Sequence, residues 1–406
     1  MEAPRTTLQP GSGRYTAAMV TAQVLTQIGA FTLPALLPLY IARWSLTSTE
    51  AGWLAGIFFA AYVPAVPVLV ALTDRYPARR IYLVGTICTA LAHLGFALVA
   101  DGFWSGLLLR AIAGIGWAGA YMPGLKSIAD PLEGAAQSRA VSWHAAGVGI
   151  AGAASFTAAG LCNAVWGPEA AFLFGGLCAV VATAIALLVL PDAWPERRAG
   201  QGVFDFGAVF RNRRAMAWIA GYTVHTWELA ALRAWGVTFL TAAIARHGAP
   251  SWLPGPTLLF TGAGLLGILV SVTGNETAQR HGRGRVVAFA MASGALLSLL
   301  AGASIAVSAP LALLAVLAWN AAIYVDSSAL TAGTVQAAEK ERRGATMGLH
   351  SMCGYGGGFL GPLGVGLMLD WAGEGTLGWA LAFGHLALFT LAGLYVVSRA
   401  NSSAAA

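Results

Sequence analysis

The sequence predicts an all-α polytopic membrane protein with twelve transmembrane helices arranged in two six-helix halves. Three observations predict this class. Of the 406 residues, 57% are hydrophobic and only 10% are charged, whereas soluble domains carry about 25% charged residues. Twelve apolar stretches approach or exceed the roughly 20 residues that a membrane-crossing helix needs. The longest polar interruption lies between the sixth and seventh stretches. The high hydrophobic and low charged content excludes a soluble enzyme, a disordered chain and a nucleic-acid-binding protein.

The apolar stretches are expected to be helices, because only helices and closed barrels satisfy the backbone in lipid and these runs are too long for barrel strands. The expected spans are 16–42, 48–71, 81–100, 104–127, 139–162, 169–190, 215–243, 254–273, 286–307, 310–332, 346–369 and 377–398. The first and the seventh are long enough to tilt or break. Pro34 and Pro38 in the first span, and Pro64 and Pro67 in the second, predict kinks.

The distribution of basic residues predicts the orientation. If the N-terminus is cytoplasmic, 19 of the 23 Lys and Arg residues fall in cytoplasmic segments, whereas the outer loops hold only Arg43 and Arg246. This bias predicts a multi-pass protein of the cytoplasmic (inner) membrane with both termini in the cytoplasm. The formal net charge of +6 then reflects the cytoplasmic loops, and no nucleic-acid partner is expected. The polar first fifteen residues do not look like a cleavable signal peptide.

The sequence also predicts an internal repeat. The expected parts are a cytoplasmic tail (1–15), an N-terminal six-helix half (16–190), a cytoplasmic linker (191–214), a C-terminal six-helix half (215–398) and a second tail (399–406). At an offset of 205 residues, Asp74-Arg75 corresponds to Gln279-Arg280, and Gln23 corresponds to Glu228. These matches at equivalent topological positions favour two parallel repeats around an axis normal to the membrane.

Two motifs carry a resemblance to a known family. The loop after the second span reads Asp74-Arg75-Tyr76-Pro77-Ala78-Arg79-Arg80, and the fourth span carries Arg110-x-x-x-Gly114-x-Gly116. With these residues the chain resembles the major facilitator superfamily of secondary transporters, whose loop signature is Gly-x-x-x-Asp-Arg-x-Gly-x-Arg-Arg. Val70 and Pro77 replace the two glycines. The run His225-Thr226-Trp227-Glu228-Leu229 resembles a group of bacterial permeases within this superfamily.

The resemblance implies a gating motif at the cytoplasmic helix ends. Its expected members are Asp74, Arg75, Arg79, Arg80, Gln279, Arg280 and Arg283. The family pattern implies that Asp74 and Arg75 hold the two halves together in the outward-facing state. The alternative is that these arginines only determine topology.

Ionisable residues inside spans are functional candidates, because burying them in a membrane is costly. In the seventh span, His225 and Glu228 are three residues apart and share a helix face. Glu228 is the best candidate for a proton carrier, because apolar surroundings favour the neutral carboxyl. Arg233 is either the ion-pair partner of Glu228 or a binder of an anionic solute. Alternatively, the three residues form a structural network that holds the helix in place.

Further candidates lie in four other spans. Arg110 either faces a central cavity or bonds to backbone carbonyls of the first span. Asp326 is either a second protonatable site or a partner of cytoplasmic arginines. Gln23 and Gln27 are four residues apart and are expected to face the cavity. Asn320 and Tyr324 share the same spacing in the tenth span and complete the list of expected substrate and proton sites.

We expect no metal and no cofactor, because the four cysteines lack metal-ligand spacing and no ATP-binding motif is present. The resemblance implies a secondary active transporter, and not an enzyme, that moves a small solute by alternating access as a monomer. Proton coupling is inferred from Glu228, Asp326 and Arg110, and the arginines inside spans slightly favour a small organic anion. Two alternatives are a membrane-embedded lipid- or acyl-transferring enzyme using His144, His350 and Asp326, and efflux of a hydrophobic compound by proton antiport.

Overall fold

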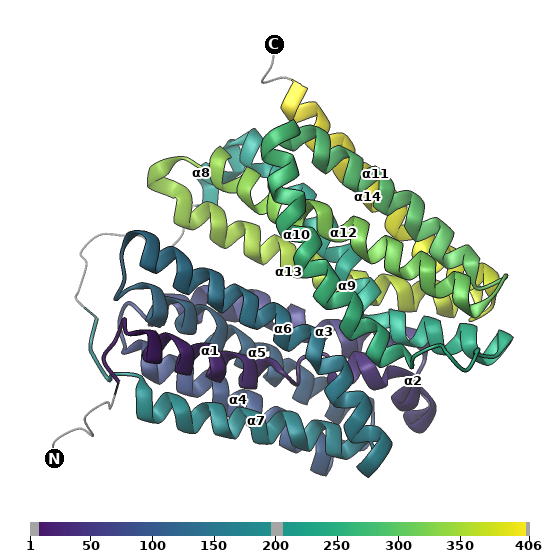
Figure 1. Ribbon diagram of the computed structural model, residues 1–406, viewed down its shortest axis with the longest axis horizontal. Helices are drawn as coiled ribbons and strands as arrows, with labels where there is room; N and C mark the ends of the chain where they lie inside the picture. The colour runs from purple at the N-terminus through teal and green to yellow at the C-terminus, as the bar shows by residue number, and fades with distance from the viewer. Residues whose placement is uncertain (1–7, 196–205, 403–406) are drawn as a thin grey trace. The chain divides into compact units, whose positions relative to one another are not determined.

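The computed structural model describes residues 8–195 and 206–402, and within these ranges the regular structure is helical without a β-strand (Figure 1). Seven helices precede residue 190: α1 (Gly13–Gln27), α2 (Thr32–Trp44), α3 (Ser48–Leu72), α4 (Ala78–Val99), α5 (Phe103–Ala129), α6 (Gly134–Trp166) and α7 (Pro168–Val189). The later elements are α8 (Phe206–Arg211), α9 (Arg213–His247), α10 (Pro256–His281), α11 (Arg283–Ser304), α12 (Ala309–Ala337), a 3-10 turn η1 (Lys340–Arg342), α13 (Arg343–Ala372) and α14 (Thr376–Ser402).

Twelve of these helices, with α1 and α2 counted as one, have the length and apolar composition needed to cross a membrane. The expected fold class, an all-α membrane protein of twelve spans, is therefore confirmed. The largest shift of a single boundary is at the end of α10, which continues to His281, eight residues past the expected end of the span. Its last turns are polar, so the apolar run marks the membrane-buried part of the helix and not its end. Part of the expected linker, residues 196–205, lies outside the described residues.

The chain forms two compact units. One consists of Met1–Ala35 with Pro64–Gln201, and the other of Leu36–Val63 with Gly202–Ala406. In the first unit α4 and α5 approach so closely that a Cβ on Gly85 would lie 2.4 Å from the backbone of Gly119. Small residues permit this kind of packing between helices in membranes. The second unit includes the first part of α3, and the boundaries of the sequence repeat stay a prediction.

The start of α3 is capped within the second unit by an acid from α13. The backbone N–H groups of Ser48 and Thr49 donate to the two carboxylate oxygens of Asp370, each at 2.8 Å. Thr47 and Glu50 form a local capping box. A carboxylate at a helix N-terminus satisfies N–H groups that have no partner inside the helix and complements the helix dipole. Asp370 therefore fixes the beginning of α3 against the end of α13.

The first span is broken, and the break lies before Pro34. Helix α1 ends at Gln27 and α2 begins at Thr32. Proline has no backbone N–H, so Pro34 cannot donate to the carbonyl of Ala30. A side-chain N–H of Arg110 in α5 donates to that carbonyl at 3.4 Å. The seventh span, by contrast, is the single continuous helix α9 from Arg213 to His247. Helix α3 likewise continues through Pro64 and Pro67.

Two more helices of the first unit satisfy the backbone at the break. The Nε2 atom of His93 in α4 lies 3.0 Å from the carbonyl oxygen of Gly29. The N–H of Phe31 donates to the hydroxyl of Ser155 in α6 at 3.0 Å. Side chains from α4, α5 and α6 thus replace the hydrogen bonds that a continuous helix would make, which is the condition for irregular backbone inside a membrane.

We predict that Ser155→Ala destabilises the protein by about 1–3 kcal/mol, because the buried N–H of Phe31 loses its acceptor. Ser142→Ala on the same helix is the control, since the Ser142 hydroxyl is exposed and bonds to Ser138 of its own helix. Unfolding of both variants in detergent measures the difference. Equal losses in the two variants would contradict this account of the break.

Candidate functional site

The second unit contains a buried pair of an acid and a base. The Nδ1 atom of His225 in α9 lies 2.8 Å from Oδ1 of Asp326 in α12, and both side chains are at most 4% exposed. The two groups form an ion pair when the ring is protonated. The structure therefore brings together two expected site residues that the sequence reasoning did not pair with each other. Among the described residues, Asp326 forms its ion pair with His225 and with no arginine.

Aromatic rings extend this pair toward α13. The ring of Tyr222 stacks on His350, with ring centres 3.8 Å apart, and its centre lies 5.8 Å from that of His225. A ring nitrogen of His350 lies 3.1 Å from the hydroxyl oxygen of Thr334. We call His225, Asp326, Tyr222 and His350 the His–Asp cluster. Its members come from α9, α12 and α13.

Glu228 has a different environment from Asp326. Its carboxylate accepts hydrogen bonds from the indole N–H of Trp319 in α12 and from the hydroxyl of Thr390 in α14, the latter at 3.0 Å. A Cβ on Gly294 of α11 would lie 3.0 Å from Oε1 of Glu228. Within the described part of the chain, no basic side chain forms an ion pair with this carboxylate. Glu228 is thus enclosed by three helices and bound by neutral donors.

Of the two alternatives for Arg233, an ion pair with Glu228 is not found among the contacts of the described residues. Five residues on an α-helix correspond to about 140° of rotation around the axis, so the two side chains leave α9 in different directions. Arg233 donates instead to the hydroxyl of Tyr324, and its guanidinium carbon lies 5.6 Å from the centre of that ring. The side-chain amide of Asn320 donates to the carbonyl of Ala263 at 2.9 Å. The contact of Arg233 with Tyr324 joins α9 to α12, and the contact of Asn320 with Ala263 joins α12 to α10.

In the first unit, Gln23 and Gln27 lie in α1, and Gln27 is the last residue before the break. Both side chains are buried, with 0% and 2% of their surface exposed. None of their four amide nitrogen and oxygen atoms has a hydrogen-bond partner among the described residues. Buried polar groups without partners are rare in native proteins, and each calls for an explanation. Both Gln23 and the ring of Tyr82 flank Gly124.

The expected gating residues of the first copy form contacts inside their own unit. Lys126 donates to Asp74 at 2.9 Å and to the hydroxyl of Thr73 at 3.1 Å. Arg79 donates to the carbonyl of Leu187 at 2.8 Å. Arg80 binds both oxygens of Asp192 at 3.1 and 3.0 Å, and these hydrogen bonds lower the pKa of Asp192. Exposed ion pairs contribute little to stability, so these contacts can open at small cost.

The other members of the gating motif lie at helix ends. Arg75, Gln279 and Arg280 are exposed, and Arg283 is half-buried. The proposed latch between the two halves stays a prediction, because the contacts of Asp74 belong to a single unit.

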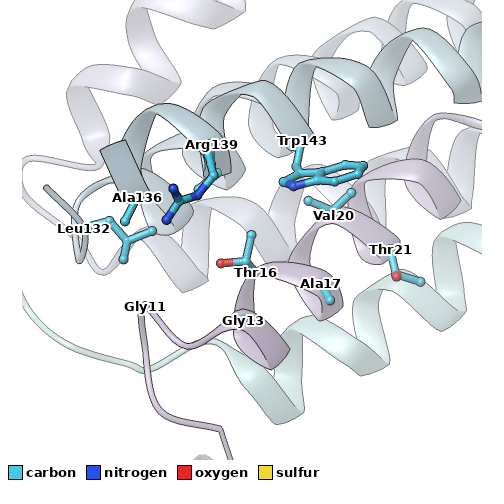
Figure 2. Close-up of a pocket in the computed structure, with 11 residues that line it drawn as sticks. Gly11, Gly13, Thr16, Ala17, Val20, Thr21, Leu132, Ala136, Arg139 and Trp143 are labelled. Carbon is cyan, nitrogen blue, oxygen red and sulfur yellow. The ribbon is translucent and has the colours of Figure 1, made fainter. Parts of the chain in front are cut away.

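A cavity of about 560 Å³ lies between α1 and α6 of the first unit. Figure 2 shows Arg139 and Trp143 of α6 lying opposite Thr16, Ala17 and Val20 of α1. The wall is mainly apolar, and Arg139 is the charged side chain among the described lining residues. The sequence reasoning assigned nothing to this region, because isolated residues at two helix ends give no spacing signal.

Four residues of the second unit were missed or underrated. Trp319 and Thr390 were not singled out, since a tryptophan or threonine in an apolar span reads as a packing residue. Tyr222 stands three residues before His225, so the helical spacing alone could have placed it on the same face. His350 entered the sequence analysis only as part of the alternative enzyme, and only the structure shows that it stacks on Tyr222.

We predict that Gln27→Leu raises the stability of the solute-free protein by about 1–3 kcal/mol, because it removes two buried groups without partners. The control is Gln137→Leu, since the amide of Gln137 is exposed and donates to the carbonyl of Ala129 at 3.0 Å. Thermal unfolding in detergent compares the two. A loss of stability in Gln27→Leu would mean that the amide is satisfied in the protein by itself.

Comparison with known proteins agrees with this architecture. The chain is similar to the nucleoside transporter NupG, with a TM-score of 0.77 and 13% identity over 95% of this chain and 99% of that one. It is similar to a bacterial homologue of the human lysosomal transporter Spinster, with a TM-score of 0.74 and 17% identity over 97% of this chain and 96% of that one. At such identities the likeness establishes the fold alone.

Two matches of sequence add to this. A putative metabolite transport protein of Haemophilus influenzae is 32% identical over 144 residues, which are 35% of this chain and 31% of that protein. The alignment therefore spans about a third of this relative. The family model of the Major Facilitator Superfamily matches residues 19–255, more than half of the chain. The protein therefore belongs to the Major Facilitator Superfamily and is a multi-pass membrane transporter.

Proposed function

We propose that this protein is a proton-coupled secondary active transporter that moves a small polar solute across the cytoplasmic membrane by alternating access. The observation that carries the proposal is the contact of 2.8 Å between His225 and Asp326 inside a bundle of membrane-spanning helices. Ionisable groups at such positions are costly, and they mark ion and proton pathways in transporters. The family membership supports transport, and the buried pair supports coupling.

The pair provides a way for a proton to act on the structure. A proton that binds to Asp326 removes the charge of the carboxylate and weakens its attraction to a protonated His225. Helices α9 and α12 then lose a charge contact that joins them. A ligand shifts a conformational equilibrium when it binds one state more strongly than the other. Protonation of Asp326 would thus favour one of two arrangements of these helices.

Glu228 is the second proton carrier that we propose. Its partners are the neutral donors Trp319 and Thr390, and an ionised carboxylate without a countercharge is costly in apolar surroundings. The alternative is a structural role, in which Glu228 only joins α9 to α12 and α14. A purely structural carboxylate would affect stability without changing the response to a proton gradient.

The solute is proposed to bind to the amides of Gln23 and Gln27. Two buried amides, whose four polar atoms have no hydrogen-bond partner among the described residues, suit a solute with its own hydrogen-bond donors and acceptors. The preference for an organic anion has less support than the sequence suggested, since Arg110 and Arg233 both have protein partners. An uncharged nucleoside is the first solute to test, because the fold is similar to that of a nucleoside transporter.

The remaining features of the proposal rest on the sequence. The positive-inside distribution supports cytoplasmic termini, and we propose a monomer without enzymatic activity. An enzyme built from His144, His350 and Asp326 has less support, because His350 and Asp326 have their own partners, Tyr222 and His225.

We predict that Asp326→Asn and Glu228→Gln each abolish the dependence of uptake on an imposed proton gradient in proteoliposomes, while exchange of solute across the membrane continues. The reason is that an amide cannot carry a proton at this site. Uridine and pyruvate serve as the uncharged and the anionic probe. Glu50→Gln is the control, since Glu50 lies at the start of α3, where its carboxylate accepts a hydrogen bond from the backbone N–H of Thr47. Unchanged gradient dependence in either site variant would remove that residue from the coupling mechanism.

We further predict that Gln27→Leu raises the KM for the transported solute about tenfold or more, because each hydrogen bond lost to a buried partner is worth about 1–3 kcal/mol. The same substitution is expected to stabilise the empty protein, so the loss of transport cannot be attributed to unfolding. The control is again Gln137→Leu. An unchanged KM for both probes would exclude Gln27 from solute binding.

A further inference from the structure

A groove in the second unit has no place in the proposed transport mechanism. Helices α10 and α11 are antiparallel neighbours that meet at Gly282, whose φ of +93° makes the turn (Figure 1). Val325 of α12 also lines the groove, and α10 packs onto it so closely that a Cβ on Gly274 would lie 2.2 Å from the carbonyl oxygen of Val325. The groove has a volume of about 800 Å³, within the usual range of about 300–1,000 Å³ for ligand sites.

The end of the groove nearest the turn is basic. Arg280 and His281 come from the last turn of α10, and Arg285 comes from the first turn of α11. All three side chains are exposed, and the hydroxyl of Thr277 lies beside them. No acidic residue is found among the lining residues that the structure describes. The nearby Glu276 forms no ion pair with Arg280 within that part of the chain. The groove thus offers donors and positive charge to an anion.

The other end of the groove is apolar. Val270 lies ten residues before Arg280 on α10, which is about 15 Å along the helix axis. On α11, Phe289 lies four residues beyond Arg285, or about 6 Å deeper. The ring of Phe289 is 72% exposed. Charge and apolar surface are therefore separated along the axes of two membrane-spanning helices, with the charge at the helix ends.

This separation matches the two parts of a phospholipid. A soluble anion such as phosphate would use the basic end and leave the apolar walls unoccupied. An anionic phospholipid would place its phosphate at Arg280 and Arg285, at the membrane boundary, and its acyl chains along Val270 and Phe289. The positive-inside distribution predicts that this end faces the cytoplasmic leaflet, where basic side chains at helix ends attract anionic lipids.

We propose that the groove between α10 and α11 is a binding site for one anionic phospholipid, held by Arg280, His281 and Arg285 at its headgroup and by Val270 and Phe289 along its chains. The proposal is independent of the transported solute and of proton coupling. It assigns a role to the basic residues of the second loop motif, in which Gln279 stands at the position that corresponds to Asp74 in the first copy.

The test titrates the purified full-length chain in detergent with dioleoyl-phosphatidylglycerol and counts bound lipids by native mass spectrometry. The variant Arg280→Gln/Arg285→Gln is compared with Arg213→Gln/Arg214→Gln. The control removes two exposed arginines from the start of α9, so both double variants lose the same charge. Thermal unfolding verifies that each variant is folded.

We expect the groove variant to bind the first phosphatidylglycerol at least about tenfold more weakly, since it loses two basic residues that attract the anionic headgroup. The control variant should bind as the wild type does. Millimolar inorganic phosphate, or glycerophosphoglycerol without acyl chains, should not displace the lipid, and Phe289→Gln should weaken lipid binding.

Three results would overturn the proposal. Equal weakening in both double variants would show unspecific attraction of lipid to positive charge. Unchanged binding in the groove variant would place the lipid elsewhere. Displacement by inorganic phosphate would identify the groove as a site for a free anion.

Discussion

The need to satisfy every backbone hydrogen-bonding group inside an apolar bundle governs the first unit. Pro34 removes a donor within the first span, and the chain between Gln27 and Thr32 leaves the helical path. His93, Arg110 and Ser155 supply the hydrogen bonds that the helix no longer makes. A charged side chain in a span thus has a structural task here. The break also ends α1 at Gln27, so the unpartnered amides stand where the helix stops.

The second unit contains two buried acids, Asp326 and Glu228, whose carboxylates have different partners. Asp326 has a basic partner, His225, and its charge matters to the contact between α9 and α12. Among the described residues, the partners of Glu228 are the neutral donors Trp319 and Thr390, and α11 approaches it at Gly294, which has no side chain. A buried charge is tolerated when it is paired with an opposite charge. The ionised form of Asp326 is therefore favoured by His225, whereas the ionised form of Glu228 has neutral donors and no countercharge among the described residues. The two acids thus differ in their environment even without a bound solute.

The sequence predicted the class of fold and the approximate position of all twelve spans, because the length of apolar runs is set by the thickness of the bilayer. It could not predict which side chains meet. The pairing of His225 with Asp326 joins residues about a hundred positions apart, and helical spacing says nothing about such contacts. The separation of Arg233 from Glu228, in contrast, follows from the angle between them on α9. For Arg110, the alternative of a backbone carbonyl in the first span is the contact that the structure contains.

The broken first span has a consequence for how the specificity of this transporter can change. Gln23 and Gln27 are oriented by a helix end that is fixed from α4, α5 and α6. A substitution at any of these supports would tilt or shift the amides that we propose as the solute site. If the glutamines bind the solute as proposed, variants with altered substrate range are expected to arise at these supports as well as at the glutamines. A library limited to the two glutamines would overlook this route to new selectivity.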